Sequence, residues 1–342
     1  MSLADEKFIS MCQDIITNGR STEGHKVRPK WEDGTPAHTV RKFGVVNRYD
    51  LSKEFPALTL RRTAIKSAVD EILWIWQRKS NNIHDLKPHI WDEWADETGS
   101  IGTAYGYQMQ IMYYWSDVNE EGLKKMYGDN FDEHIHHLAQ SSGSHYIPSS
   151  QTYSGSSINK DVVAVSIYDR GVNTPACTYY YMDQVNKVLY DLINNPFSRR
   201  IMTNIFNFND LSTMHLQPCA YSMTFSVTED DDGLILNGIL NQRSQDVLAA
   251  NNWNVVQYAV LLHMLARHVN MRVGELVHVI ADAHIYDRHV QMIEELISRT
   301  PHPAPKFTLN PEKTNFYDFT SDDVIIEDYE TGEQIKNIPI AV

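Results

Sequence analysis

One segment of the sequence, NNWNVVQYAVLLHMLARHV at residues 251–269, restricts the possible folds more than any other. Over 252–269 its apolar residues fall on nearly every side of a helix instead of along one stripe. A helix that is apolar all round is stable only when other elements cover it on all sides. We therefore predict that this helix is central and buried, with the remaining strands and helices packed around it.

Strands are predicted along much of the remaining chain. Runs that alternate apolar and polar residues and are rich in β-branched and aromatic types favour strands. Strands and helices alternate irregularly and include an antiparallel hairpin, so we expect one domain of α+β layers and not a doubly wound sheet. The expected strands are 201–208, 216–227, 234–247 and 276–289, the last running into a helix, and amphipathic helices are expected at 5–17 and 61–79.

The strand LQPCAYSMTFSV (216–227) carries Cys219 near its start, directly after a proline. A free cysteine is commonly a small buried hydrophobe, and that is the alternative to a reactive thiol. The turn that follows is centred near Asp231, and antiparallel pairing about that centre places Cys219 opposite Arg243, to within a residue or two. Opposed side chains share a face, and a guanidinium beside a thiol lowers its pKa. Cys219 is therefore a candidate nucleophile.

The helix expected at 61–79 contains one acidic residue on a mostly apolar face, Glu71. A carboxylate in that position is either exposed at the edge of its helix or buried with a raised pKa, and the second case is typical of functional sites. Its neighbours three and four positions away are Ser67, Ala68, Trp74 and Ile75.

Charge and cysteine content limit the partners and the compartment. The net charge of −14 argues against a nucleic-acid partner, because neutralising phosphates requires a basic surface. Three scattered cysteines, Cys12, Cys177 and Cys219, do not form a disulfide framework, so a reducing, cytoplasmic compartment is expected, with Cys12 in the core. The charged start MSLADEKFIS lacks the apolar region of a secretory signal, and no apolar run approaches the ~20 residues of a membrane span.

Two stretches look like surface features. HIWDEWADETG (89–99) combines two tryptophans with four acids, which indicates an exposed aromatic surface. Residues 117–178 show little periodicity, and we expect a surface insertion there, since loops of this length are usually functional or mobile. Its histidines suggest a metal site, but no carboxylate or cysteine ligand pattern accompanies them, so we predict no metal. These histidines are His134, His136, His137 and His145.

Several polar groups follow the apolar elements at points where a site can form. QRSQD (242–246) ends a strand, Asn254 opens the buried helix, and His284 and Tyr286 share one face because they are two apart on a strand. Arg199 and Arg200 follow a turn in NPFSRR. A nucleophile, cations for phosphate, amides and hydroxyls for orientation, and aromatic rings for stacking suit a nucleotide better than a peptide or an ester.

The motifs that carry these residues resemble those of the thymidylate synthase family. The similar motifs occur in the same order over nearly the whole chain outside the insertion. They are DEILWIWQ, HIWDEWADETG with IGTAYG, NPFSRR, LQPCAYSMTFSV, LNQRSQDV, NNWNVVQYAVLLHMLA, DAHIYDRH and the final IPIAV.

The resemblance implies a reaction, a fold and an assembly. The reaction is the reductive methylation of dUMP to dTMP, in which 5,10-methylenetetrahydrofolate supplies the one-carbon unit and the hydride and leaves as dihydrofolate. The fold is a large twisted mixed β-sheet covered by helices on one face, and two copies dimerise through the sheet. Arg199 and Arg200 are donated across that interface, so a monomer is expected to be inactive.

The resemblance also implies three sets of site residues and no metal. The catalytic set is Cys219, Glu71, Tyr105, Arg243 and Asn254. The substrate-binding set is Arg28, Arg199, Arg200, Gln242, Arg243, Ser244, Asp246, Asn254, His284 and Tyr286. The folate-binding set is Ile90, Trp91, Trp94, Leu216, Asp246, Ala250, Trp253 and Val342.

Within these sets each residue has an implied role. Cys219 attacks C6 of the uracil ring, and Arg243 contacts the phosphate and supports the thiolate. Glu71 relays protons at O4 and at the folate nitrogen, and Tyr105 takes part in removal of the C5 proton. Asn254 reads the O4 and N3 edge of uracil. The remaining implied roles are phosphate binding by Arg28, Arg199 and Arg200, binding of the ribose hydroxyl by His284 and Tyr286, and closure over the site by Val342.

The chain departs from the family pattern in places, and these departures keep alternatives open. VRPKWEDGTPAHT replaces the usual arginine-threonine-glycine loop near the N-terminus, Ala250 stands where a glycine is common, and Ala220 replaces a larger residue. A dUMP hydroxymethylase, in which water replaces the hydride, is one alternative; Asn254, Trp91 and IPIAV favour the synthase. The others are a non-catalytic nucleotide- or RNA-binding protein and, more weakly, a cysteine hydrolase, for which no histidine is an evident base.

Overall fold

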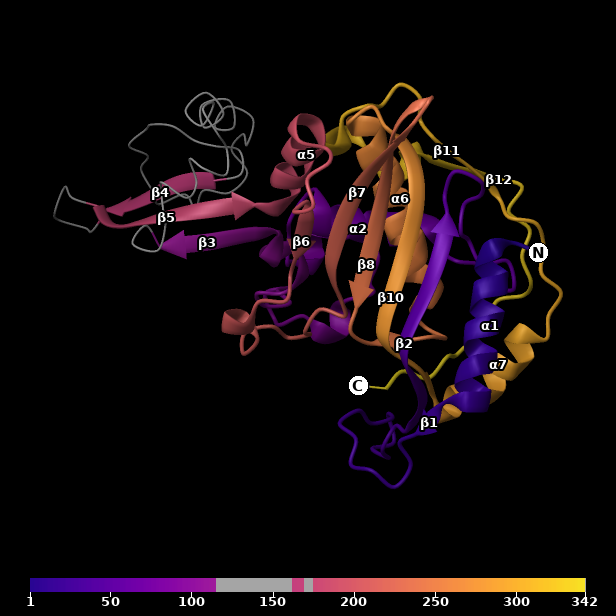
Figure 1. The fold of residues 1–342 in the computed structure, drawn as a ribbon. Coiled ribbons are helices and arrows are strands. Elements are labelled where there is room, and N and C mark those ends of the chain that lie inside the picture. The colour runs from indigo at the N-terminus through magenta and orange to yellow at the C-terminus, as the bar shows by residue number, and fades with distance from the viewer. Residues whose placement is uncertain (115–161, 169–174, 342) are drawn as a thin grey trace.

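A seven-stranded mixed sheet forms the centre of the fold (Figure 1). The computed structural model describes the backbone of residues 1–114, 162–168 and 175–341, and the side chains of residues 1–110 and 183–341. β10 is parallel to β8 and β9, and every other neighbouring pair in this sheet is antiparallel. The path of strands is β1 (Arg20–Ser21), β2 (Thr39–Asp50), β10 (Arg272–Tyr286), β8 (Gly233–Gln242), β7 (Ala220–Asp230) and β6 (Met202–Asn204), with β9 (Gln245–Asp246) beside β10.

Helices and two smaller sheets complete the fold. No helix in the described ranges is long and apolar enough to cross a membrane. The longer helices are α1 (Leu3–Asn18), α2 (Ile65–Trp76), α5 (Gln184–Asn194), α6 (Asn251–His268) and α7 (Val290–Ile297). Short 3-10 helices span Ile83–Asp85, Asp92–Trp94, Tyr105–Met109, Phe208–Asp210, Asp287–His289, Phe316–Asp318 and Ser321–Asp323. The smaller sheets pair β11 (Lys306–Leu309) with β12 (Val324–Glu327), and β5 (Pro175–Asp183) with β3 (Gln110–Tyr114) and β4 (Val162–Tyr168).

These elements confirm the predicted α+β fold, but two of the predicted strands have different bounds. The strand predicted at 201–208 is shorter, and the one predicted at 234–247 divides into β8 and β9 because Arg243 and Ser244 leave the ladder. The insertion predicted at 117–178 lies mostly outside the described residues, as do the four histidines within it. The parts of the insertion that the structure describes are β4 and the first residues of β5, and these strands extend away from the large sheet (Figure 1).

Helix α6 occupies the centre, as its all-round apolar sequence predicts. It lies between the sheet strands β8 and β10 and helix α2. The side chains of Val256, Ala259 and Leu262 on successive turns are fully buried. Sheet and helix approach closely at Gly238 of β8, where an added Cβ would lie 3.2 Å from Leu262 Cδ1. The same Cβ would lie 2.9 Å from Met223 Cε on β7, so any larger residue requires the Met223 and Leu262 side chains to shift.

Helix α1 is attached to the core by a buried carboxylate near its first turn. Ser2 caps the helix, since its Oγ accepts the N–H of Asp5 at 3.1 Å. Asp5 Oδ1 accepts the backbone N–H groups of Thr59 and Leu60 at 2.8 and 3.2 Å. Further along the helix Cys12 is fully buried, which confirms its predicted place in the core, and burial raises the pKa of its thiol.

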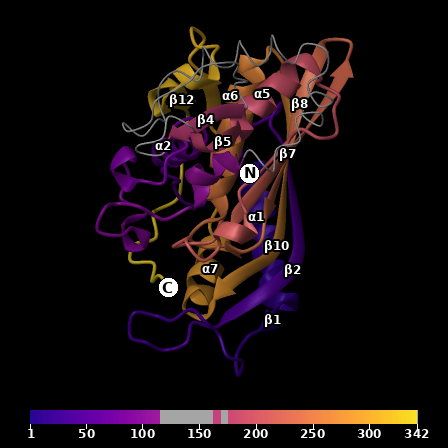
Figure 2. The same ribbon diagram turned by 90° about the vertical axis from the view of Figure 1, so that its left-hand side faces the viewer.

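The sheet face away from α6 carries exposed apolar side chains. In Figure 2 the large sheet lies along the right-hand side of the molecule and the helices lie mainly to its left. The register places Val277 of β10 between Arg48 of β2 and Ile239 of β8, with Val46 beside them. Val46 is 52% exposed and Ile239 is 39% exposed, which is unusual for central strands of a large sheet.

Replacing Leu262 by alanine is expected to lower the free energy of unfolding by about 2–5 kcal/mol, because it leaves a cavity between α6 and the sheet. Urea unfolding at one fixed protein concentration measures the change. The Leu262→Met variant is expected to cost less than about 1.5 kcal/mol. Ile193→Ala on α5, where the side chain is 58% exposed, is expected to change it by less than about 0.5 kcal/mol. Equal losses at Leu262 and Ile193 would contradict the central position of α6.

Candidate active site

The register of the β7–β8 hairpin places Cys219 directly opposite Arg243, as predicted. Along most of the hairpin the pairing follows Ser222↔Asn241, but an extra residue, Tyr221, bulges out before Ala220↔Gln242. The N–H of Arg243 then donates to the carbonyl oxygen of Cys219 at 2.9 Å. Without this bulge the register would place Cys219 opposite residue 244. The bulge is therefore what sets the guanidinium against the thiol.

The Arg243 side chain is fixed by the loop that precedes Cys219. Its Nε donates to the carbonyl oxygen of Pro218 at 2.9 Å, and its Nη2 donates to that of Gln217 at 2.7 Å. The same Nη2 lies 3.6 Å from Cys219 Sγ. These three contacts hold the guanidinium beside the thiol.

The pKa of the Cys219 thiol differs from the prediction. Burial raises it, and this effect outweighs the opposing charges of Arg243 and Arg28, so the net shift is upward. The sequence predicted a lowered thiol pKa. The lowering effect of the guanidinium is present, but the net shift is upward because burial has the larger effect, and the sequence did not show that burial. Arg28 is exposed, but its charge lies near enough to the thiol to lower the pKa of Cys219.

Tyr105 contacts the same cysteine from another segment. It has a left-handed backbone conformation with φ of 49°, and its hydroxyl oxygen accepts the N–H of Cys219 at 3.3 Å. Burial raises the pKa of Tyr105 well above 10, and the neighbouring Cys219 adds to this shift, so the phenol is neutral. Its ring centroid lies 4.6 Å from that of Trp91.

Glu71 is buried, which confirms the second of the two alternatives drawn from the sequence. Trp91 Nε1 donates to its Oε1 at 2.8 Å, and Trp253 Nε1 and Gln257 Nε2 donate to its Oε2 at 2.5 and 2.6 Å. Burial raises its pKa even though these three hydrogen bonds oppose the shift. The prediction of an exposed aromatic surface at 89–99 is wrong for Trp91, which is only 6% exposed. Its indole N–H is buried because it donates to Glu71.

Asn254 is connected to Glu71 by a series of side-chain amides. Its Nδ2 donates to Gln257 Oε1 at 3.0 Å, and Gln257 Nε2 donates onward to Glu71. Its Oδ1 accepts from Gln242 Nε2 at 3.2 Å and from Gln245 Nε2 at 3.3 Å. Gln242 Nε2 also donates to the carbonyl oxygen of residue 244, so this atom must be the amide nitrogen. The Asn254 atom that it contacts must then be the oxygen, and this fixes the orientation of both amides. Asn254 therefore has one N–H left for a ligand.

His284 and Tyr286 share one face of β10, as predicted. Their ring centroids are 5.1 Å apart with planes nearly perpendicular. His284 Nδ1 lies 3.0 Å from Asp282 Oδ1, and since a carboxylate only accepts, Nδ1 carries a hydrogen and Nε2 of the neutral ring is an acceptor. Burial, with the nearby charge of Asp246, raises the pKa of Tyr286 to about 12, which keeps its hydroxyl a donor.

Asp246 organises the loop that enters α6. Its Oδ1 accepts the N–H groups of Leu248 and Ala249, each at 3.0 Å. Burial acts to raise the pKa of Asp246, but the imidazole of His289 and the Ala249 N–H lower it, and the net shift is downward. The carboxylate is therefore ionised and at least partly engaged by the protein itself.

The other predicted residues lie at three places. Arg199 and Arg200 are exposed in the turn between α5 and β6, and the cations whose charge reaches Cys219 are Arg243 and Arg28. Val342 lies outside the described residues. The third group lies near Glu71 and the start of α6, and its side chains are partly buried or exposed. These residues are Ile90, Trp94, Leu216, Ser244 and Ala250.

Sequence reasoning missed two residues that hold the site together, Gln257 and Gln245. Each is about 2% exposed or less, and both contact Asn254. A signal for Gln257 was present, since it is a polar amide one turn after Asn254 on a helix that is otherwise apolar. Gln245 lies within the QRSQD segment that the sequence marked as polar, but no pattern indicated its contact with Asn254, because that contact depends on how β9 turns toward α6.

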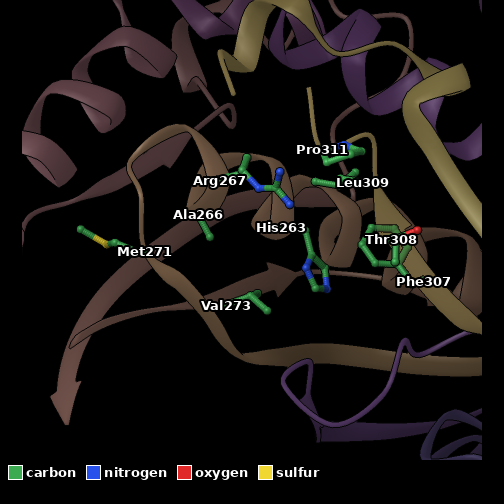
Figure 3. Close-up of a pocket in the computed structure, with 9 residues that line it drawn as sticks. All are labelled: His263, Ala266, Arg267, Met271, Val273, Phe307, Thr308, Leu309 and Pro311. Atoms are coloured by element: carbon green, nitrogen blue, oxygen red, sulfur yellow. The ribbon is translucent and has the colours of Figure 1, made fainter. Parts of the chain in front are cut away.

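A separate cavity of about 550 Å³ lies at the far end of α6 (Figure 3). It is largely apolar and contains none of the predicted site residues, so it does not correspond to the candidate active site. Among the described side chains, no three or more histidine, cysteine or acidic residues are grouped as metal ligands would be. The cavity is lined by His263, Ala266, Arg267, Met271, Val273, Phe307, Thr308, Leu309 and Pro311.

Comparisons with known proteins show the family of the chain. A family model described as "Thymidylate synthase" matches residues 6–342. Thymidylate synthase from Bacillus licheniformis is 35% identical over 339 residues, and thymidylate synthase 1 from Bacillus subtilis (strain 168) is 34% identical over 339 residues; both alignments cover 98% of each chain. Thermostable thymidylate synthase A from Bacillus subtilis has a similar structure, with a TM-score of 0.74 at 33% identity over 99% of each chain. The chain therefore belongs to the thymidylate synthase family.

Proposed function

We propose that the groups around Cys219 form the active site for the reaction of this family, the reductive methylation of dUMP to dTMP. The enzyme is a methyltransferase, and 5,10-methylenetetrahydrofolate supplies its one-carbon unit and hydride. The observation that carries the site assignment is that Cys219, held beside a guanidinium, and Glu71, linked by amides to Asn254, both lie close enough to Tyr105 to act on its pKa. A nucleophile, a proton donor and a base reader are thereby within one connected site.

The thiol is the proposed nucleophile toward C6 of the uracil ring. Its raised pKa keeps Cys219 mostly protonated before substrate binds, so its activation depends on Arg243 and Arg28. Covalent addition at C6 makes C5 nucleophilic and divides one difficult substitution into easier steps. The neutral hydroxyl of Tyr105, held at the Cys219 backbone, is positioned to take part in removing the C5 proton.

Glu71 is the proposed acid that moves protons at O4. Since its pKa is raised, it stays protonated to a higher pH than an exposed glutamate does, which favours a role as proton donor. Asn254 presents an N–H donor, which matches the O4 acceptor of uracil and does not match the amino group of cytosine.

The nucleotide's phosphate and ribose are assigned to groups at the other end of the site. Arg243 and Arg28 supply charge near Cys219, and we assign Arg199 and Arg200 of a second copy to the same phosphate. His284 Nε2 and the Tyr286 hydroxyl are proposed partners of the ribose hydroxyl, one as acceptor and one as donor.

The aromatic wall beside Glu71 suits the flat ring of a reduced folate. Trp91 and Trp94 lie with centroids 5.6 Å apart, and Leu216 is half-buried beside the core. We assign Ile90, Asp246, Ala250, Trp253 and Val342 to the same ligand on the family resemblance. These apolar side chains would also exclude water from the one-carbon unit.

We propose a homodimer formed through the open sheet face. Exposed Val46 and Ile239 lie on that face, and a face of this kind on central strands is typical of an interface. A reducing, cytoplasmic setting is proposed because Cys12 and Cys219 are free thiols.

Incubation of the protein with dUMP and 5,10-methylenetetrahydrofolate is expected to give dTMP and dihydrofolate in equal amounts, followed by dihydrofolate absorbance and nucleotide mass. Cys219→Ala is expected to reduce turnover at least about 10⁴-fold, because no other nucleophile replaces the thiol, while dUMP still binds. Hydroxymethyl-dUMP with tetrahydrofolate would instead show that water traps the one-carbon unit. Normal turnover by Cys219→Ala would remove the thiol from the mechanism.

Removing the charges near the thiol is expected to raise its pKa further, and thus to slow its reaction with iodoacetamide. At pH 7.5 we expect Arg243→Gln to slow alkylation of Cys219 by roughly 3- to 10-fold, and Arg28→Gln by less. Mass spectrometry of the Cys219 peptide over pH 6–10 gives the midpoint. Arg272→Gln, an exposed arginine beside the turn of the β7–β8 hairpin and far from Cys219, is the control. Unchanged midpoints in both site variants would show that these guanidiniums do not govern the thiol.

Mixing two inactive variants tests the shared site. Cys219→Ala and the double variant Arg199→Ala/Arg200→Ala are each expected to be inactive alone. After unfolding and refolding together they are expected to recover about a quarter of wild-type activity, because half of the dimers are mixed and each mixed dimer has one complete site. Sedimentation confirms dimers in every sample. No recovery in dimers that are well folded would place these arginines outside the partner's site.

A further inference from the structure

His289 lies where separate segments of the chain meet at the edge of the proposed site. It follows β10, and its side chain is fully buried. Its ring centroid is 5.6 Å from that of Tyr286 and 5.7 Å from that of Trp31, in the loop before β2. Its Nε2 is 2.8 Å from the carbonyl oxygen of Pro339 in the C-terminal tail, and its Nδ1 is 3.6 Å from Asp246 Oδ1.

The two oxygens decide which hydrogens the ring needs. A carbonyl oxygen only accepts, so Nε2 of His289 carries a hydrogen and donates it to Pro339. In a neutral ring Nδ1 would then direct a lone pair at the Asp246 carboxylate, inside the protein. The imidazolium presents an N–H to both oxygens. Nδ1 is buried without a hydrogen-bond partner, and a movement of about half an ångström would complete its bond to Asp246.

The charges around the ring favour the same form. Burial lowers the pKa of His289, but Asp246, the Pro339 carbonyl and Asp287 raise it, and the net shift is upward. The adjacent Arg288 is turned away over the ring of Trp31, at 4.9 Å from its centroid. Arg288 is also paired with Asp33 at 2.7 Å, so it does not oppose the imidazolium directly.

Two more charges belong to the surroundings of Asp246 and the tail. Arg61 is close enough to Asp246 for the carboxylate to act on the pKa of its guanidinium. The terminal carboxylate belongs to Val342, outside the described residues. Elsewhere in the tail, Ile335 and Ile338 pack against the cluster formed by α1, α7 and β10, and the Arg299 guanidinium donates to the carbonyl oxygen of Glu333.

We propose that His289 is a positioning residue that joins the C-terminal tail to Asp246 and thereby holds the tail beside the folate end of the site. Its effect on catalysis rests on the proposed function, whereas the attachment of the tail does not. Loss of the attachment would act on binding of the folate, which the tail and Asp246 are assigned to contact, more than on binding of dUMP.

Release of the last three residues by carboxypeptidase Y measures the attachment without any assay of activity. Rates are compared for wild type, His289→Phe, which fills the aromatic site and removes both donors, and His289→Gln, whose amide nitrogen replaces Nε2. A free peptide ending in IPIAV corrects for the protease itself at each pH. His25→Gln, in an exposed loop, is the matched control.

At pH 6 release from His289→Phe is expected to be roughly 3- to 10-fold faster than from wild type, the ratio for one lost hydrogen bond. Because the folded pKa of His289 is raised, the N–H that Nδ1 presents to Asp246 is present below the ordinary histidine pKa and lost as the pH rises through the folded pKa. Wild-type release is therefore expected to accelerate as the pH is raised. His289→Gln is expected to be intermediate and independent of pH. In the synthase assay both variants are expected to raise the KM for folate more than the KM for dUMP.

Equal release rates in folded wild type and His289→Phe would overturn the proposal, and so would the same pH dependence in wild type and His289→Gln. If His289→Phe does not fold, the pH comparison with His289→Gln decides alone. A wild-type protein without synthase activity would disprove the proposed function, but the release rates would still test the attachment.

Discussion

The burial of α6 is the constraint on which the rest of the structure depends. Because this helix is apolar on all sides, the sheet must cover one side and α2 the other, and this brings Glu71 of α2 against the first turns of α6. Those turns carry Trp253, Asn254 and Gln257, which all belong to the hydrogen-bonded set around the carboxyl. The same packing that stabilises the fold therefore assembles the polar interior of the site.

The ionisable groups of the site are controlled by loss of water, with nearby charges as the second influence. Burial raises the pKa of Glu71, Tyr105 and Cys219, and in each case hydrogen bonds or cations only reduce the shift. For Glu71 the result extends the protonated form to higher pH, and for Tyr105 it keeps the phenol neutral. For Cys219 it means that the proposed nucleophile is mostly protonated, and we infer that Arg243 and Arg28, which are proposed to bind the phosphate, also support the thiolate.

Local irregularities of the backbone bring side chains of the site into contact that regular strands and helices would leave apart. The bulge at Tyr221 changes the register by one residue and sets Arg243 against Cys219, and the break after β8 lets Gln245 reach Asn254. The left-handed conformation of Tyr105 turns its hydroxyl toward the backbone of Cys219. All three lie at segment ends around the site, where strain and irregular pairing commonly occur.

The sequence by itself indicated most of the predicted elements, the central helix, the family and, to within a residue or two, the pairing of Cys219 with Arg243, because these depend on periodicity, turn position and motifs that are local in the chain. The exact pairing was decided by the bulge at Tyr221. It also marked Glu71 as a carboxylate on an apolar face. Only the tertiary structure decided which alternative held for Glu71, that Trp91 is buried, and that the thiol pKa rises, since burial is a sum over segments far apart in sequence. The links through Gln245 and His289 were likewise decided there, because each joins segments whose separation in space no local pattern records.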